Sequence, residues 1–218
     1  MKINDIEIII KRKNIKNMYL RVVPPNGDVT LSVPSHIGDE EIINFINSKM
    51  DWILEKKSLM KYVTPLKYVN GEEHYLWGNP YTLQLIANNI KEAFFRENII
   101  YLPVSKRSRM QNRQKTLEDF YRREVEKEID SIYDKCINLV GRSPIEIKIR
   151  KMKNWGNCRK NGIITLNLKL AMKPKICLEY VFIHELCHLI EFNHSRRFYE
   201  LMDNYCPNWR EIKKMLNE

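Results

Sequence analysis

The chain has 218 residues, of which 44% are hydrophobic, and a formal net charge of +10 at pH 7. This length suffices for one large domain or two small ones, and the composition is that of a globular protein, which excludes a disordered chain. No apolar run reaches membrane-spanning length, and Met1–Asp5 lacks an apolar signal segment, so we expect a cytoplasmic protein without membrane contacts. The five cysteines are scattered without a Cys-x-x-Cys pair, which favours reduced, buried thiols.

The first part of the chain is expected to consist mainly of strands and turns. Alternating apolar residues predict strands at 6–10, 18–23 and 29–33, and Asn26-Gly27 is a hairpin turn signal. The spacing then changes, because apolar residues recur at helical intervals over 42–54 after an acidic first turn. Further short strands and turns are expected between residues 66 and 102.

A basic stretch, Ser105–Lys115, predicts a domain boundary or an exposed loop. We therefore expect a β-rich N-terminal region with one helix at residues 1–115 and a second domain at residues 116–218. Thr116 and Asp119 resemble a capping box, and the apolar positions behind them predict one face of a long helix that ends at Gly141.

After this helix the sequence predicts strands at residues 145–149 and 163–168. The second of them directly precedes an apolar segment that begins near Pro174, a residue suited to the first turn of a helix. It is a candidate edge strand for pairing with an extended peptide, although an interior strand is equally compatible with the sequence. The last segment, 196–218, is expected to form two short helices separated near Pro207.

The most informative segment is the apolar run from Ile176 to Phe192, which is typical of a buried helix. His184 and His188 lie four residues apart, so a helix places both imidazoles on one stripe, with Glu185 beside them. Buried polar side chains need a partner, and a divalent cation is the simplest one. This His-Glu-x-x-His pattern is typical of a zinc site in which the glutamate acts as general base on a metal-activated water.

A third ligand is expected shortly after this pair. His194 is favoured, because a chain turn at Asn193, with Ser195 as the N-cap of a following helix, would bring its ring back to the metal. Glu191 is the rival ligand; otherwise it is either a hydrogen-bond acceptor for a ligand N–H or a partner in a salt bridge. Cys187 points away from the histidine stripe and is expected to pack in the core.

Several motifs taken together resemble the YgjP-like metallopeptidase family, which is related to the SprT-like and Wss-type zinc proteases. They are Trp155–Cys158, Gly162–Leu168, Tyr180–His188 and Asn193–Phe198, with Met50–Ile53 and Leu76–Gly78 in the first half. The family usually has serine where this chain has Asn157. The resemblance implies zinc held by His184, His188 and His194, with Glu185 catalytic.

The expected fold is therefore α+β, with a small zincin-like metalloprotease domain built around a buried His-Glu-x-x-His helix. The expected activity is hydrolysis of peptide or protein substrates by a zinc-dependent peptidase. A donor for the tetrahedral oxyanion is also required, and the candidates are Tyr199, Tyr205 and Asn157.

A different class of function is also compatible with the basic composition. Two patches stand out: Lys106, Arg107, Arg109, Arg113 and Lys115, and then Lys148, Arg150, Lys151, Lys153, Arg159 and Lys160. The chain could bind nucleic acid and hold a structural zinc, which would need four protein ligands, or it could be a protease recruited to nucleic acid. A solvated surface explains either patch equally well.

Overall fold

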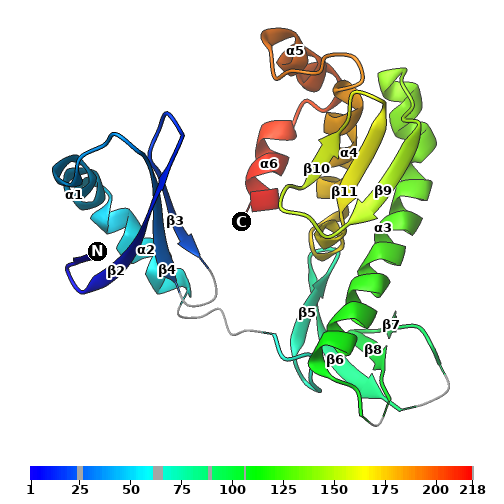
Figure 1. Ribbon diagram of the computed structural model, residues 1–218. Coiled ribbons are helices and arrows are strands. Elements are labelled where there is room, and N and C mark those ends of the chain that lie inside the picture. Colours follow the sequence, from blue (N-terminus) through cyan, green and yellow to red (C-terminus); the bar gives the residue numbers. More distant parts are fainter. Residues whose placement is uncertain (24–26, 61–65, 88–89, 106, 218) are drawn as a thin grey trace. The chain divides into compact units, whose positions relative to one another are not determined.

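The computed structural model describes residues 1–23, 27–60, 66–87, 90–105 and 107–217. The chain divides into two compact units, Met1–Leu66 and Lys67–Glu218 (Figure 1). Both units combine helices with sheets, so the expected α+β class is confirmed. Within these ranges, no helix has both the length and the apolar character that a membrane crossing requires.

The first unit is a four-stranded sheet with two helices packed on one face. Its strands are β1 (Lys2–Ile3), β2 (Ile6–Lys13), β3 (Tyr19–Val23) and β4 (Asp28–Pro34), in the order β1-β2-β4-β3. β2 runs parallel to β4, and β3 runs antiparallel to it. The helices α1 (Asp39–Ser48) and α2 (Met50–Met60) close a core around Ile8, Leu31, Ile42, Ile46 and Ile53. The three strands expected here are confirmed.

The one helix expected over residues 42–54 is instead two. α1 ends at Ser48, whose hydroxyl donates to the carbonyl of Phe45 at 2.8 Å, and its cap Lys49 leaves the helical region with φ −113° and ψ 9°. The break turns Leu54 to solvent, with 52% of its surface exposed. In the expected hairpin turn, Gly27 has φ 70°, and Asn26 lies outside the described residues.

The second unit begins with another four-stranded sheet, in the order β5-β6-β8-β7. Its strands are β5 (Glu73–Leu76), β6 (Asn79–Ile86), β7 (Phe94–Arg96) and β8 (Ile99–Pro103). The β5–β6 turn has positive φ at both Trp77 and Gly78 (51° and 82°), as a type I′ hairpin requires. Its tip is anchored to later segments, because Trp77 N–H donates to the carbonyl of Ala171 at 2.6 Å and Gly78 lies against Pro174.

These contacts place the boundary between the two units at Leu66/Lys67, not at the expected 115/116. The apolar face of the β5–β8 sheet has no separate core of its own. Leu83 and Ile100 share one hydrophobic cluster with Phe120 and Phe182 from later helices. The basic stretch misled the prediction because it contains the start of a helix that covers this sheet.

That helix is α3 (Met110–Val140), 31 residues long. It starts after Arg109, so Thr116 lies inside it, donating its hydroxyl to the carbonyl of Asn112 at 3.0 Å, and the expected capping box is wrong. The expected end is confirmed: Gly141 adopts a left-handed φ of 72°, and its N–H donates to the carbonyl of Ile137 at 2.7 Å.

A three-stranded sheet and a buried helix form the centre of the second unit. The strands are β9 (Glu146–Arg150), β10 (Gly156–Cys158) and β11 (Ile163–Asn167), in the order β10-β11-β9. β11 pairs antiparallel with β10 and parallel with β9, so the candidate edge strand at 163–168 is in fact interior. The short strand β10 occupies the edge instead. Figure 1 shows α4 (Lys175–Cys187) behind these strands and α3 alongside.

The remaining elements complete the core around α4. A 3₁₀ turn, η1 (Leu168–Met172), leads into this helix, in which residues such as Cys177, Phe182 and Cys187 are fully buried. The packing role expected for Cys187 is thus confirmed. The last segment forms α5 (Arg196–Tyr205) and α6 (Trp209–Asn217), the two short helices that were expected.

Candidate metal centre

Three histidines converge at the end of α4. His184 lies in its last turn, His188 is its C-cap, and His194 lies in the loop before α5. One ring nitrogen from each lies within 4.8 Å of the other two, and Nε2 of His184 is 3.2 Å from Nε2 of His194. The structure therefore brings together the three side chains that the sequence singled out.

The chain reverses direction earlier than expected. The helix ends at Cys187 and does not continue to Phe192, because the N–H groups of Leu189 and Ile190 donate to carbonyls three residues back, those of Leu186 and Cys187, each at 3.0 Å. Asn193 does not adopt the left-handed conformation. Ser195 does cap α5 as expected, with its hydroxyl oxygen accepting the N–H of Phe198 at 3.4 Å. This short connection returns His194 to the end of α4.

Glu191 acts through its main chain. Its carbonyl oxygen lies 3.2 Å from Nδ1 of His188 and can accept the N–H of that ring atom. Such a bond selects the tautomer in which Nε2 of His188 keeps its lone pair, as in the outer shell of many metal sites. The carboxylate of Glu191 is not part of the convergent group and forms no ion pair with a described residue. The expected acceptor position is present, but the oxygen is the carbonyl.

A single aromatic ring supports all three imidazoles. Phe198 is fully buried, and its ring centroid lies 4.5 Å from that of His188, 4.7 Å from that of His194 and 4.9 Å from that of His184. Phe198 is the first buried residue of α5, so the cap at Ser195 also fixes the position of the Phe198 ring against which the three imidazoles pack. Packing of this kind limits the ring rotations that would otherwise separate the three nitrogens.

The local electrostatics keep the rings of His184 and His188 neutral. Burial lowers the pKa of His184 to about 3, with further lowering by His188, His194 and Lys213. Burial also lowers the pKa of His188. A neutral imidazole offers a lone pair, which is the state that a metal ligand needs.

The donor set fits a tetrahedral cation. Two imidazole nitrogens bound to one tetrahedral Zn²⁺ lie roughly 3.3 Å apart, close to the separation between His184 and His194. Three imidazole ligands suit zinc better than a hard cation such as Mg²⁺. Within the described ranges, no fourth histidine, cysteine or acid joins the three, which leaves a coordination position free for a small molecule.

Glu185 lies beside this group with an incomplete set of partners. It is only 5% exposed, its Oε2 is buried without a hydrogen bond to any described atom, and the N–H of Cys158 donates to its carboxylate. Burial raises the pKa of Glu185 to about 8. A carboxylate in this state is poised to hold a proton near neutral pH, and a nearby cation would pull its pKa down again.

The strand β10 holds the carboxylate by its main chain. The carbonyl of Trp155 accepts from Asn167, and the N–H of Arg159 donates to Ile163, so the intervening Gly156 and Cys158 turn their main-chain groups away from β11. A Cβ at Gly156 would lie 2.8 Å from Cγ of Glu185 and overlap the carboxylate. The φ of Gly156 is not positive, so its backbone conformation does not require glycine. Glycine is required because a side chain has no space beside the carboxylate.

Two pockets open on either side of His184. The first, of about 140 Å³, is walled by aromatic residues including Tyr199 and Trp209, and the second, of about 210 Å³, lies between Trp155 and α6. Both share Tyr180, His184 and Lys213.

The sequence predicted only part of this lining. Of the expected oxyanion donors, Tyr199 lines the first pocket, whereas Tyr205 packs on the core and Asn157 is exposed, and neither lines either pocket. Tyr180 was missed, although it lies one helical turn before His184 on the same face of α4. Lys213 was missed too, because nothing in its local sequence links α6 to the motif.

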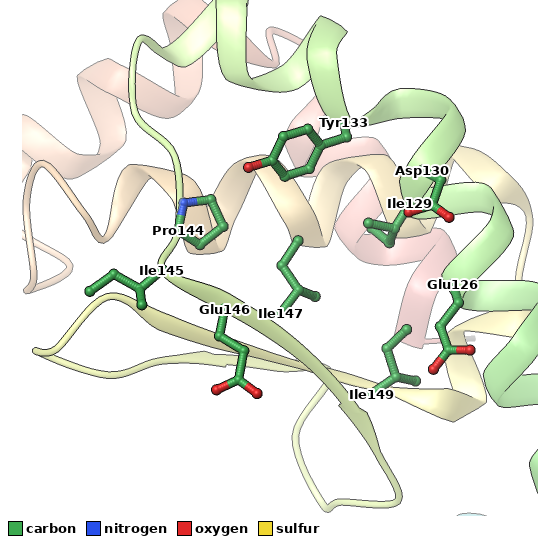
Figure 2. Close-up of a pocket in the computed structure, with 9 residues that line it drawn as sticks. All are labelled: Glu126, Ile129, Asp130, Tyr133, Pro144, Ile145, Glu146, Ile147 and Ile149. Carbon is green, nitrogen blue, oxygen red and sulfur yellow. The ribbon is translucent and has the colours of Figure 1, made fainter.

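A separate pocket of about 270 Å³ lies between α3 and β9 (Figure 2). Its floor includes Ile147 and Ile149, and its rim carries Glu126, Asp130 and Glu146. It contains no histidine or cysteine and none of the three convergent rings. This pocket is therefore distinct from the group of three histidines at the end of α4.

Comparison with known proteins decides the family. The model of the YgjP-like metallopeptidase domain matches residues 16–218. The chain belongs to the YgjP-like metallopeptidase family. The resemblance drawn from the sequence motifs is thereby confirmed, and as a member of this family the chain is a metallopeptidase, acting on peptides or proteins with the help of a metal ion.

Other comparisons add little to the family assignment. No curated protein matches the chain. Among solved structures, the metallopeptidase zymogen abylysin of Pyrococcus abyssi is 25% identical, over 42% of this chain and 90% of that one. Its TM-score of 0.37 is too low for a structural argument.

The basic patches are partly neutralised in the structure. Lys148 pairs with Glu146 at 2.9 Å and Lys151 with Glu118 at 2.6 Å, while Arg113 donates to the carbonyl of Tyr68. Lys106 lies outside the described residues. Nucleic-acid binding stays a prediction.

Proposed function

We propose that this family member is a zinc-dependent peptidase in which His184, His188 and His194 hold the ion and Glu185 is the general base. The proposal depends on one observation: three imidazole nitrogens converge beside a buried carboxylate that has an unpartnered oxygen. Structural polar clusters satisfy their buried atoms, so an oxygen without a described partner, on a side chain that lines the second pocket, favours a catalytic role.

The chemistry divides between the ion and the chain. Zinc, when bound, supplies Lewis acidity that makes water more acidic and polarises the scissile carbonyl. Glu185 takes one proton from the attacking water while the oxygen of that water bonds to the carbonyl carbon. Glu185 then delivers the proton to the leaving amine nitrogen. The N–H of Cys158 holds the carboxylate in place through both transfers.

The substrate is proposed to bind as an extended strand against β10. The free edge of this strand presents the main-chain groups of Gly156 directly beside Glu185, where an added strand would lay a peptide bond over the base. The candidate oxyanion donors near His184 are Tyr180, which lines both pockets, and Tyr199, which lines the first.

Metal analysis of the purified protein tests this function. The wild type is expected to retain close to one zinc per chain and to cleave an unfolded protein substrate, and chelation should abolish the cleavage. His188→Ala should lose both zinc and activity, because two imidazoles remain. Cleavage that persists at the wild-type rate in a zinc-free preparation would contradict the proposal.

The alternative with a structural zinc is less well supported. It requires four protein ligands, and the described residues provide three. Recruitment of the peptidase to nucleic acid remains open to test by binding to DNA at increasing salt, since binding through the phosphates must weaken steeply.

A further inference from the structure

We propose that Lys213 forms a carboxylate-binding subsite beside the catalytic centre, so that the substrates are peptides that carry a free carboxylate near the cleaved bond. This inference rests on the proposed function and deepens it. The carboxylate has two sources, a C-terminal carboxylate or an acidic side chain, and the experiment below separates them.

The position of Lys213 points to a ligand in the active site. It lies on α6 and lines both pockets that flank His184. The walls of the first pocket are otherwise aromatic or imidazole groups with Met202, and in the second the one carboxylate is the buried Glu185. Among the residues that the structure describes, Lys213 is thus the only ammonium or guanidinium group that lines either pocket, and it reaches both from one side chain.

Its charge is not neutralised by the described part of the chain. Trp209 lies under two cations, with Lys213 Nζ 5.6 Å and the Arg210 guanidinium 4.4 Å from the ring centroid. Arg210 pairs with Asp203 at 2.6 Å. None of the described carboxylates pairs with Lys213. An ammonium group that is held by an aromatic face but lacks an acid is suited to an incoming anion.

The electrostatic surroundings favour a carboxylate over a second cation. Lys213 lines the same two pockets as His184, so its positive charge acts on the centre itself. The competing negative group, Glu185, is held by the N–H of Cys158 and is turned toward β10. A substrate carboxylate at Lys213 would therefore be attracted by the lysine and kept apart from the base.

One end of the second pocket is bridged. The indole N–H of Trp155 donates to Oδ1 of Asn217 at 3.3 Å, which connects the loop before β10 to α6. The peptide pairing with β10 thus enters a short space between β10 and α6, with Lys213 on the α6 wall. A substrate peptide whose C-terminus or acidic side chain lies in this space would place its carboxylate within reach of Lys213 Nζ.

Peptide binding tests the subsite without turnover. The probes are three N-acetylated hexapeptides of the same neutral sequence: one with a free C-terminal carboxylate, one amidated with a single glutamate, and one amidated without any acid. Each is titrated by calorimetry into the full chain carrying Glu185→Gln, both zinc-loaded and metal-free. We expect at least one carboxylate peptide to bind about tenfold more tightly than the neutral one, and which peptide does so identifies the source.

Matched variants assign the effect to Lys213. Lys213→Gln should remove the tenfold preference in both metal states, and Lys213→Arg should keep most of it. Lys214→Gln is the control, because Lys214 is an exposed neighbour that lines neither pocket. Equal binding of all three peptides, no binding of any of them, or a preference that survives Lys213→Gln would overturn the proposal.

Kinetics separate this role from transition-state stabilisation. In the wild-type background, Lys213→Gln should raise KM for the carboxylate substrate and leave its kcat nearly unchanged. For the neutral substrate, neither KM nor kcat should change much. An equal fall in kcat for all peptides would assign Lys213 to the oxyanion and reject the subsite. If no peptide is cleaved, the proposed function fails, while the titration still reports on Lys213.

Discussion

Two clusters in the second unit contain histidine and glutamate, but they differ in how fully their polar atoms are hydrogen-bonded. In the first, Nε2 of His74 lies 2.9 Å from Oε2 of Glu72, and this carboxylate also accepts the main-chain N–H groups of Lys67 and Tyr68 at 2.6 and 2.7 Å. In the second, the carboxylate of Glu185 has one main-chain donor and a buried oxygen without a described partner. The first cluster is closed and the second is open.

The pKa values record this difference. Burial acts to raise the pKa of Glu72, but donors from Lys67, His74 and Tyr68 outweigh it and the net pKa is lowered. Burial raises the pKa of Glu185 to about 8, against the single donor at Cys158. The same residue types therefore stabilise the fold where both carboxylate oxygens are paired, and are available for chemistry where one oxygen has no described partner.

The largest expected effect is that of Glu185→Gln. It should reduce peptide cleavage by about 10²–10⁴-fold, because an amide cannot accept the proton, while zinc content stays at the wild-type level. Stability should be unchanged or slightly higher, since a buried, underpaired carboxylate is removed. Zinc analysis, a cleavage assay and urea unfolding measure the three quantities. Wild-type cleavage by this variant would remove Glu185 from its role.

Phe198→Ala tests whether the imidazoles depend on their aromatic support. Loss of this buried ring should cost about 3–5 kcal/mol of unfolding free energy. Zinc affinity should fall about 10–100-fold, as for other groups that orient ligands. Denaturant unfolding and zinc competition with a chelator measure the two effects. Phe192→Ala is the control, since Phe192 is 45% exposed and contacts only His188 among the three rings. Equal losses in both variants would contradict the supporting role.

Gly156→Ala tests how Glu185 is placed. The added methyl group overlaps the carboxylate, so activity should fall about 10²-fold through misplacement of the base, with zinc retained. Gly38→Ala is the control, because nothing lies within 4 Å of a Cβ there. Cleavage and zinc content are compared for both variants. Unchanged cleavage in Gly156→Ala would show that the carboxylate is free to move.

The smallest effect is expected in the closed cluster. Glu72→Gln should lower the unfolding free energy by about 1–2 kcal/mol and leave specific activity unchanged. The pKa values of His74 and Glu72 are both lowered on folding, so the stability they contribute is present at neutral pH. It is lost as the pH falls, first below the ordinary histidine pKa of about 6.5 and then below that of glutamate. Urea unfolding between pH 8 and pH 3 measures this slope. The variant should lose the part below the ordinary glutamate pKa, and its slope near pH 6 should steepen, because Glu72 raises the pKa of His74 against the effect of burial. A shallower slope near pH 6 in the variant would contradict the assignment.

The convergence of the three histidines could be predicted from the sequence because the information is local. His184 and His188 are linked by helical periodicity, and the return of His194 follows from the turn that precedes the cap at Ser195. His74 has no ligand-spaced companion in the sequence, and in the structure it forms a closed pair with Glu72.

The errors arose where structure depends on distant contacts. The pairing that places β11 inside the sheet and β10 at its edge is not encoded in either strand alone. The unit boundary was misplaced because the docking of Trp77 onto Ala171 joins segments almost a hundred residues apart. Lys213 reaches the centre only through the packing of α6, so no spacing rule could predict it.

The way β10 holds Glu185 makes its three positions unequal in mutational tolerance. The anchor at Cys158 is a main-chain amide, which side-chain replacement leaves in place. The main-chain groups of Asn157 pair with β11, and its side chain is exposed to solvent. A substitution at this position should therefore cost little stability, in keeping with asparagine where the family usually has serine. Gly156 has no such freedom, because every other residue would intrude on the carboxylate. Positions 157 and 158 of this strand should therefore tolerate substitution, whereas position 156 should not.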